Sequence, residues 1–357
     1  MTQMLSPVLR SSRLSHTEEQ SAALKPVTTL EIPNGEEAQD RTRPPRLSCV
    51  VPCWNEATNL AQLLPQLATT LTDLCEEWEV VLVDDGSTDG TPNLLAEWAR
   101  RPGFRALQLS RNFGKEAALT AGLEAAQGDV VVMMDADLQH SPGLIAPMIR
   151  HWQAGADVVY ALRQSRADES GIKRLGARLF YALVNAADRF EVPAGAGDFR
   201  LMDRAVVNAL LALPERNRFM KGLYGWVGFD AVAIPYTPEP RAHGSTHFSM
   251  LKLMKLSMDG LTAFTTWPLR AVSAGGFGLA LLAFLYGGYL TIDYLLNGHT
   301  VSGWTTIVVG LMLFSGLQLI AIGIAGEYIA RIFEEVKARP LYVVKREMGQ
   351  GLRARQE

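Results

Sequence analysis

VVVMMDADLQ, residues 130–139, joins a short apolar run to a pair of acids. The run Val130–Met134 is rich in β-branched residues, which predicts a buried strand. Asp135 and Asp137 follow it directly. In extended backbone, residues i and i+2 point the same way, so both carboxylates can face one divalent cation. A DxD spacing alone is weak evidence, and its position behind a buried strand strengthens it.

Short β-rich runs alternate with helical runs on both sides of this stretch. The alternation predicts an α/β fold in which helices cover a parallel sheet. The predicted strands are Leu47–Val51, Glu79–Val83, Arg105–Leu109, Val130–Met134 and Asp157–Ala161. The predicted helices are Glu56–Leu71, Thr91–Arg100, Lys115–Ala126, Pro142–Ala154 and Ser170–Arg189. In such sheets ligands bind beyond the carboxyl ends of the strands, where we expect the functional side chains.

Two further strand ends carry polar side chains. The first strand leads into Pro52-Cys53-Trp54-Asn55-Glu56, and the second ends in Asp84 and Asp85. A carboxylate at the end of an apolar run can accept a hydrogen bond from a base or from a ribose hydroxyl. Asp89 and Thr91 are interpreted as helix caps. Glycine-rich dinucleotide and P-loop fingerprints do not occur in the sequence, which removes the main support for an oxidoreductase or an ATPase.

The composition excludes several classes of protein. Of the 357 residues, 48% are hydrophobic and 20% charged, so the chain is not a mainly disordered polymer. Its net charge of −3 gives no electrostatic case for binding nucleic acid. Cys49, Cys53 and Cys75 form no CxxC pair and have no neighbouring histidines, which supports neither a disulfide framework nor a zinc site.

The C-terminal third carries two long uncharged runs. Ala271–Ile292 has 22 uncharged residues and Val301–Gly326 has 26, each enough to cross a hydrocarbon core. Lys and Arg flank the outer ends of this pair and are missing between the runs, so both flanks are predicted to be cytoplasmic. The alternative is a pair of buried core helices. Phe248–Phe264, just before the pair, has the pattern of an amphipathic helix in the membrane interface.

These observations predict five segments along the chain. They are a disordered leader (1–46), an α/β domain (47–240), interface helices (241–268), a transmembrane hairpin (269–326, with spans of about 270–292 and 303–326) and a cytoplasmic tail (327–357).

Six motifs occur in order along the chain. They are Pro52–Glu56, Asp84–Thr91, Arg111–Gly114, Asp135–Gln139, Gly197–Arg204 and the stretch from Gly326-Glu327-Tyr328 to Arg339-Pro340-Leu341-Tyr342. Together they resemble the family 2 glycosyltransferases of the polyprenyl-phosphate type, which include dolichol-phosphate mannose synthases and bactoprenol glucosyltransferases. The resemblance covers about residues 47–345.

The resemblance implies a GT-A (Rossmann-like) glycosyltransferase domain followed by amphipathic interface helices and a two-helix transmembrane hairpin. It implies inverting transfer of a hexose from a nucleotide-diphosphate sugar to polyprenyl (undecaprenyl) phosphate at the cytoplasmic membrane face. Glucose from UDP-glucose is the first expectation, and mannose, N-acetylglucosamine and formyl-aminoarabinose are alternatives. The expected protein is integral to the inner membrane and homo-oligomeric, with the catalytic domain and both termini cytoplasmic. A further alternative is a non-catalytic membrane nucleotide-binding scaffold for lipid translocation.

The resemblance also implies roles for individual residues. Those expected at the nucleotide-sugar are Pro52, Asn55, Glu56, Asp84, Asp85, Lys115, Asp135, Ala136, Asp137 and Gln139. Asp135 and Asp137 would hold Mg²⁺ or Mn²⁺. The expected catalytic residues are Asp198, Asp137 and Arg200, and the expected contacts to the acceptor or diphosphate are Arg200, Arg218 and Lys221.

Two residues modify this picture. Asp198 matches the acid often proposed as a base, but a phosphate monoester has a second pKa of about 6 and is already dianionic near neutral pH. Asp198 then orients the acceptor or its cation. His247 stands where the family commonly has lysine, so either Arg241 substitutes for that cation or the donor differs.

The sequence also lacks the Gln-x-x-Arg-Trp motif of processive polysaccharide synthases. This favours transfer of a single sugar to the lipid carrier over synthesis of a polymer.

Overall fold

The computed structural model describes residues 41–163, 196–216, 218–237, 267–297 and 303–352. Several predictions fall partly or wholly outside these residues, among them the leader as far as residue 40, the helix Ser170–Arg189 and the interface helix Phe248–Phe264. Arg241 and His247 also lie outside them.

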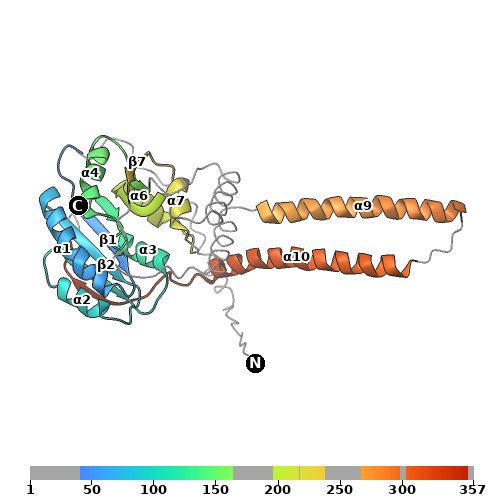
Figure 1. The fold of residues 1–357 in the computed structure, drawn as a ribbon, viewed down its shortest axis with the longest axis horizontal. Coiled ribbons are helices and arrows are strands. Elements are labelled where there is room, and N and C mark those ends of the chain that lie inside the picture. Colours follow the sequence, from blue (N-terminus) through green and yellow to red (C-terminus); the bar gives the residue numbers. More distant parts are fainter. Residues whose placement is uncertain (1–40, 164–195, 217, 238–266, 298–302, 353–357) are drawn as a thin grey trace, which may run out of the picture. The chain divides into compact units, whose positions relative to one another are not determined.

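One eight-stranded sheet organises the described part of the α/β domain (Figure 1). Its strands are β1 (Leu47–Cys53), β2 (Trp78–Asp84), β3 (Phe104–Leu109), β4 (Val130–Met133), β5 (Val158–Arg163), β6 (Ala196–Asp203), β7 (Ala231–Tyr236) and β8 (Val344–Gly349), in the order β7-β5-β6-β4-β1-β2-β3-β8. The five strands predicted from the sequence are all present. The sheet is mixed rather than parallel, because β6 runs antiparallel to β4 and β5, and β8 runs antiparallel to β3.

Helices cover both faces of the sheet. The helices α1 (Ala57–Leu74), α2 (Thr91–Trp98) and α4 (Ile145–Gln153) pack on one face. The helices α3 (Lys115–Ala125), α6 (Arg204–Ala212) and α7 (Met220–Trp226) pack on the other. Neighbouring residues of β1 alternate between the two cores, because successive side chains of a strand point to opposite faces. The face that carries α3 and α7 is the one at which the first turns of these two helices contribute to the candidate active site.

β8 closes the β3 edge of the sheet with residues from the far end of the chain. Ala106 of β3 faces Met348 of β8 in the antiparallel ladder. The Arg105 guanidinium pairs with the Glu347 carboxylate at 2.6 Å, and the Leu352 backbone N–H donates to the buried Glu79 carboxylate at 2.9 Å. Part of the stretch expected as a tail, 327–357, thus belongs to the sheet.

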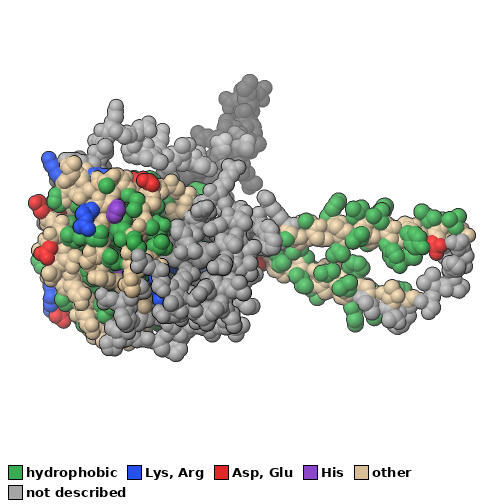
Figure 2. Space-filling model, turned by 45° about the horizontal axis from the view of Figure 1, so that its top comes forward, with side chains coloured by type: hydrophobic (Ala, Val, Ile, Leu, Met, Phe, Trp, Pro, Cys, Tyr) green, Lys and Arg blue, Asp and Glu red, His purple; other side chains and the backbone are tan. Residues whose placement is uncertain are grey.

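Two long apolar helices precede β8. The helices α9 (Trp267–Asn297) and α10 (Trp304–Lys337) lie side by side (Figure 1). Ala271–Leu290 and Thr306–Lys337 are long and apolar enough to cross a membrane, judged by length and composition. Large apolar side chains are exposed along both helices (Figure 2), so neither has the burial that the core-helix alternative requires.

Candidate active site

A turn after β4 presents the two acids of the DxD motif. Ala136, between them, is buried, and Leu138 has a positive φ of 60°. The Gln139 backbone N–H donates to Asp137 Oδ1 at 3.1 Å, which holds the turn. The Asp135 side chain remains a quarter exposed, at 25%. The motif therefore sits at the carboxyl end of a buried strand, where a ligand can reach it.

Lys115 joins β4 to β6 across the site. Its Nζ lies 2.6 Å from Asp135 Oδ1 and 2.6 Å from Asp198 Oδ2. Burial alone would lower the pKa of Lys115, but the charges of Asp135 and Asp198 outweigh it and raise this pKa. Burial would likewise raise the pKa of Asp198, and the ammonium groups of Lys115 and Lys221 lower it instead. Asp198 is therefore an ionised carboxylate at neutral pH.

Arg200 contacts backbone and an aromatic ring near this pair. Its side chain is buried, its Nη2 donates to the Gly197 carbonyl at 2.7 Å, and its guanidinium stacks 3.4 Å from the centroid of the Tyr224 ring. Its Nε has no hydrogen-bond partner among the described residues. Arg204 donates to the Gly128 carbonyl, so neither arginine is the close ionic partner of Asp198.

The two acids that end β2 have different surroundings. Both carboxylate oxygens of Asp85 accept backbone N–H groups, from Phe113 at 2.7 Å and Gly114 at 2.9 Å, which fixes the loop before α3. Asp84 Oδ1 accepts the Ser87 N–H at 2.9 Å. Asp84 Oδ2 is buried and has no hydrogen-bond partner within the described ranges, which is uncommon for a buried carboxylate oxygen.

The end of β1 is tied to the loop after β2. Pro52 is buried in β1, and Asn55 has a positive φ of 56°. The Asn55 N–H donates to Ser87 Oγ at 2.9 Å, and its side-chain oxygen accepts the Thr88 N–H at 2.8 Å. Asn55 thus shapes the loop that follows Asp84.

Asp89 and Thr91, interpreted as caps, both bind backbone N–H groups near helix starts, although the N-cap residue of α2 itself is Gly90. Thr91 Oγ1 accepts the Glu56 N–H just before α1 at 3.0 Å. Asp89 binds at two helix starts. Its carboxylate accepts the Thr91 N–H at the start of α2 at 3.0 Å and the Ala57 N–H at the start of α1 at 3.3 Å.

The pKa of Glu56 is raised in part by the negative charges of the DxD turn. Burial raises the pKa of its carboxyl group, a hydrogen bond from Asn59 lowers it, and the charges of Asp137 and Asp135 raise it further. A divalent cation bound by Asp135 and Asp137 would relieve this repulsion. In the part of the chain that is described, no three His, Cys, Asp or Glu side chains gather into a metal cluster. Two carboxylates fit Mg²⁺ or Mn²⁺ when a substrate's phosphates supply further oxygens.

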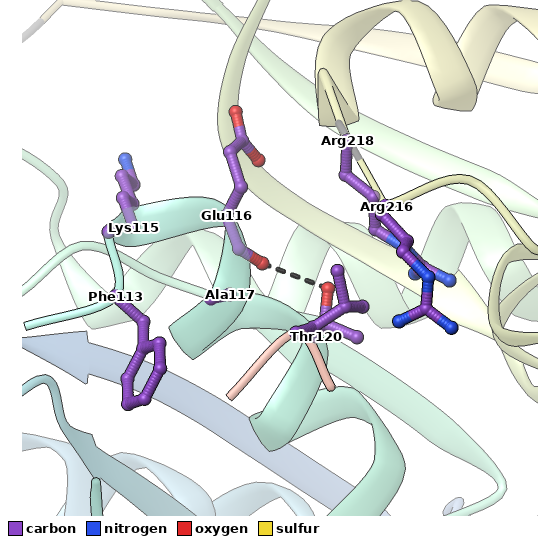
Figure 3. Close-up of a pocket in the computed structure, with 9 residues that line it drawn as sticks. Phe113, Lys115, Glu116, Ala117, Thr120, Arg216 and Arg218 are labelled. Carbon is purple, nitrogen blue, oxygen red and sulfur yellow. Dashed lines mark hydrogen bonds between the residues drawn. The ribbon is translucent and has the colours of Figure 1, made fainter. Parts of the chain in front are cut away.

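A cavity of about 260 Å³ opens beside Lys115. Figure 3 shows Lys115 and Glu116 on the first turn of α3, with Arg216 and Arg218 on the segment that leads into α7. Phe113, Gly114, Ala117, Thr120 and Leu341 complete the lining. Arg218 is 9% exposed. Its Nη2 and Nε donate to the carbonyls of Leu213 and Glu215, at 2.8 and 3.2 Å.

Glu116 also belongs to the site, although no sequence motif identifies it. Its carboxylate accepts the Met220 backbone N–H at the start of α7, and its Oε2 is buried without a partner in the described structure. Burial, followed by the charge of Asp198, raises its pKa to about 7. The only sequence signal was its place beside Lys115, since burial depends on the tertiary packing of α3 against α7.

The raised pKa of Glu116 predicts how stability depends on pH. The folded protein binds this proton more tightly than the unfolded chain, so the stabilisation present below pH 4.5 is lost as pH rises towards 7. Glu116→Gln cannot ionise and keeps an acceptor for Met220. At pH 8 we expect the free energy of unfolding of Glu116→Gln to be higher than that of the wild type by on the order of 2 kcal/mol. This difference should become smaller as the pH is lowered towards 4.5.

Thermal unfolding of both proteins across pH 4.5–8 measures this difference. Glu76→Gln, at an exposed loop position, is the control. Parallel stability curves for wild type and Glu116→Gln would contradict the prediction.

The predicted residues thus form three groups. Asp135, Lys115 and Asp198 meet directly, whereas Asp84 and Asn55 lie at the neighbouring β1 and β2 ends. Arg218 lines the cavity instead, and Lys221 acts on Asp198 through its charge.

Comparison with known proteins gives concordant matches. Residues 48–211 match the family model described as Glycosyl transferase family 2. An uncharacterized glycosyltransferase of Synechocystis is 42% identical over 299 residues, covering 84% of this chain and 94% of the relative. The bactoprenol glucosyl transferase of Shigella phage SfV is 41% identical over 307 residues, covering 85% of this chain and 99% of the relative.

Among solved structures, the mannosyltransferase PcManGT from Pyrobaculum calidifontis, in complex with GDP-Man and Mn²⁺, is 18% identical with a TM-score of 0.42. The match covers 83% of this chain and 88% of that one.

Proposed function

Because this chain belongs to glycosyl transferase family 2, we propose that it transfers a hexose from a nucleotide-diphosphate sugar to polyprenyl phosphate, with inversion at the anomeric carbon. The favoured donor is UDP-glucose, and the favoured carrier is undecaprenyl phosphate. Support for this substrate pair comes from relatives named bactoprenol glucosyl transferase, which match this chain over nearly their whole length. Family membership makes the chain a glycosyltransferase and argues against the non-catalytic scaffold.

The observation that carries the proposal is the meeting of Asp135, Lys115 and Asp198 at the carboxyl ends of the strands. In this proposal the donor nucleoside binds at the β1 and β2 ends, where Asp84 Oδ2 accepts from the base or ribose. Pro52, Asn55 and Asp85 shape that end of the site, and Ala136 and Gln139 hold the turn that faces the diphosphate.

Asp135 and Asp137 are proposed to hold Mg²⁺ or Mn²⁺, as the charge around Glu56 favours. When bound, the ion offsets negative charge on the departing nucleoside diphosphate. Lys115, paired with Asp135, supplies a fixed positive charge in the same place.

The acceptor phosphate is itself the nucleophile, and near neutral pH it needs no general base. Asp198, held ionised by Lys115, is a poor proton acceptor because its pKa is lowered. We therefore propose that Asp198 positions Lys115 and the sugar. Arg200 holds the backbone next to Asp198 through its hydrogen bond to the Gly197 carbonyl. Arg218 and Lys221 reduce the repulsion between two anionic substrates.

The two apolar helices are proposed to anchor the enzyme in the inner membrane, with its catalytic domain and both termini cytoplasmic. Residues 47–240 together with β8 then form the catalytic unit, 241–268 the interface segment and 269–326 the hairpin. A lipid-linked phosphate lies in the headgroup layer, so an anchored site meets it there. We also expect a homo-oligomer, which light scattering in detergent can test.

The test combines full-length protein in detergent, Mn²⁺, polyprenyl phosphate and a radiolabelled nucleotide-sugar. We expect label to move into the organic phase most rapidly from UDP-glucose. Preferred transfer from GDP-mannose, UDP-N-acetylglucosamine or UDP-formyl-aminoarabinose would replace the glucose assignment with that sugar. If no nucleotide-sugar yields an organic-extractable product, the proposed function is wrong.

A further inference from the structure

His140 follows the DxD turn and is held by side chains of two other strands. Its side chain is buried, at 7% exposure. Its Nε2 shares a hydrogen bond of 2.8 Å with the Tyr236 hydroxyl of β7. The centroid of its ring lies 5.0 Å from that of Tyr236 and 4.9 Å from that of Phe199 on β6. The imidazole therefore links the loop after β4 to both β6 and β7.

The contacts on β6 lie on either side of Asp198. Phe199, which follows Asp198, is fully buried against the ring of His140. Gly197, which precedes it, lies so close that a Cβ built there would be 4.0 Å from His140 Nε2. The same ring thus packs beside the acid that pairs with Lys115 and belongs to the loop that carries Asp135 and Asp137.

The backbone between Asp137 and His140 has an unfavourable conformation. Leu138 has a φ of 60°, in the left-handed region, which costs a residue with a side chain roughly 1–2 kcal/mol. Such a conformation persists where surrounding contacts fix it. The bond from the Gln139 N–H to Asp137 is one such contact, but it involves a carboxylate that is also a proposed cation ligand. His140, two residues after Leu138, anchors the turn through a group that is not an acid.

His140 and Tyr236 are both uncharged near neutral pH. Burial lowers the pKa of His140 by more than the charges of Asp135 and Asp137 raise it. Burial also raises the pKa of Tyr236, so its hydroxyl keeps its proton. The pair therefore adds no charge beside the two acids. Any effect that it has on a bound cation acts through the position of the carboxylates.

We propose that His140 and Tyr236 are positioning residues for the cation site: their hydrogen bond holds the DxD turn so that Asp135 and Asp137 face one divalent ion opposite Asp198. This inference rests on the proposed function, which assigns the ion to those two acids. It also gives the edge strand β7 a role in the reaction, since Tyr236 acts from there on the turn after β4.

Mn²⁺ binding measured without nucleotide or lipid provides the first test. Electron paramagnetic resonance of free Mn²⁺, added to full-length protein in detergent, gives the dissociation constant. Tyr236→Phe keeps the ring and removes one oxygen, and His140→Phe keeps a ring without nitrogens. We expect each to weaken Mn²⁺ binding by roughly tenfold, as loss of a group that orients metal ligands commonly does.

The double variant shows whether the two residues act as a pair. Because both substitutions remove the same hydrogen bond, His140→Phe/Tyr236→Phe should weaken Mn²⁺ binding no further than the more severe single variant. If its loss equals the product of the two single losses, the residues act independently and the proposal is wrong.

The Mn²⁺ dependence of sugar transfer provides the second test. Tyr236→Phe should need roughly tenfold more Mn²⁺ for half-maximal transfer. Its rate at saturating Mn²⁺ should return to within about twofold of the wild type, since mass action offsets a weakened affinity. A defect of folding alone would not be restored by the ion.

Two exposed residues supply matched controls. They are His151→Phe on α4 and Tyr286→Phe on α9, and both should bind Mn²⁺ as the wild type does. Tyr236→Phe keeps the proposal testable if His140→Phe does not fold. Wild-type Mn²⁺ affinity in Tyr236→Phe would overturn the proposal, even at a lowered unfolding temperature, because a merely structural contact would change stability alone.

Failure of this inference is distinguishable from failure of the proposed function. If the wild type makes glycolipid and the Tyr236 variant keeps its Mn²⁺ affinity, only the positioning role is refuted. If the variants bind Mn²⁺ more weakly but the wild type transfers no sugar, only the reaction is refuted.

Discussion

Replacing Asp135 and Asp137 together by asparagine is expected to lower sugar transfer by roughly three orders of magnitude or more. Both carboxylates stand on the turn after β4, and no described cluster of three acids, histidines or cysteines offers another metal site. Asparagine preserves side-chain size and can still accept the Gln139 N–H. The loss should therefore reflect charge rather than packing.

Three measurements test this expectation. Product formation should fall in the double variant, Mn²⁺ affinity measured by titration should fall with it, and EDTA should abolish wild-type transfer until Mn²⁺ is restored. Asp73→Asn, exposed on α1, is the control for loss of one carboxylate. Wild-type turnover by the double variant, or turnover in excess EDTA, would refute the role assigned to these acids.

Ending the chain at Val343 is expected to abolish cooperative unfolding of the α/β domain. The truncation removes β8, whose ladder with β3 spans five paired positions, and also the Leu352–Glu79 hydrogen bond. Each hydrogen bond contributes about 1 kcal/mol net. Their sum is comparable with the total stability of a domain, about 5–15 kcal/mol. An exposed β3 edge would in addition promote pairing between chains.

Thermal unfolding and limited proteolysis in detergent provide the readout. Gly349→Val serves as a milder version, because Gly349 has a φ of +83° and a Cβ there would collide with the carbonyl oxygens of Phe104 and Ala99. Lys345→Ala, exposed on the same strand, is the control. A truncated protein that unfolds at the wild-type temperature would show that β8 is dispensable.

The strands and helices from residue 47 to 163 could be predicted because each is a local pattern. The apolar run Val130–Met133 and the amphipathic pattern of α1 can each be recognised from the local sequence alone. β7 and β8 could not be identified this way. β7 contains Pro235 and alternates between exposed and half-buried residues, and β8, VKREMG, is largely exposed and charged. Only pairing with β5 and β3 makes them strands.

The acidic residues of the candidate site could be predicted from the sequence, but most of the residues that pair with them could not. Asp135 and Asp198 are recognisable from motifs, but their shared partner, Lys115, depends on bringing α3, β4 and β6 together. Asp84 and Asp85 look equivalent in the sequence. Only the fold shows that both Asp85 oxygens accept from backbone N–H groups, whereas one Asp84 oxygen has no partner in the described part of the chain. Charge and burial arise from packing that local patterns do not contain.

The position of β8 has a consequence for biosynthesis. A ribosome makes Val344–Gly349 only after it has made both apolar helices, so the sheet stays open at β3 until the hairpin has emerged. A nascent chain stalled before that point would lack a finished catalytic sheet. Completion of the sheet is thereby tied to completion of both apolar helices.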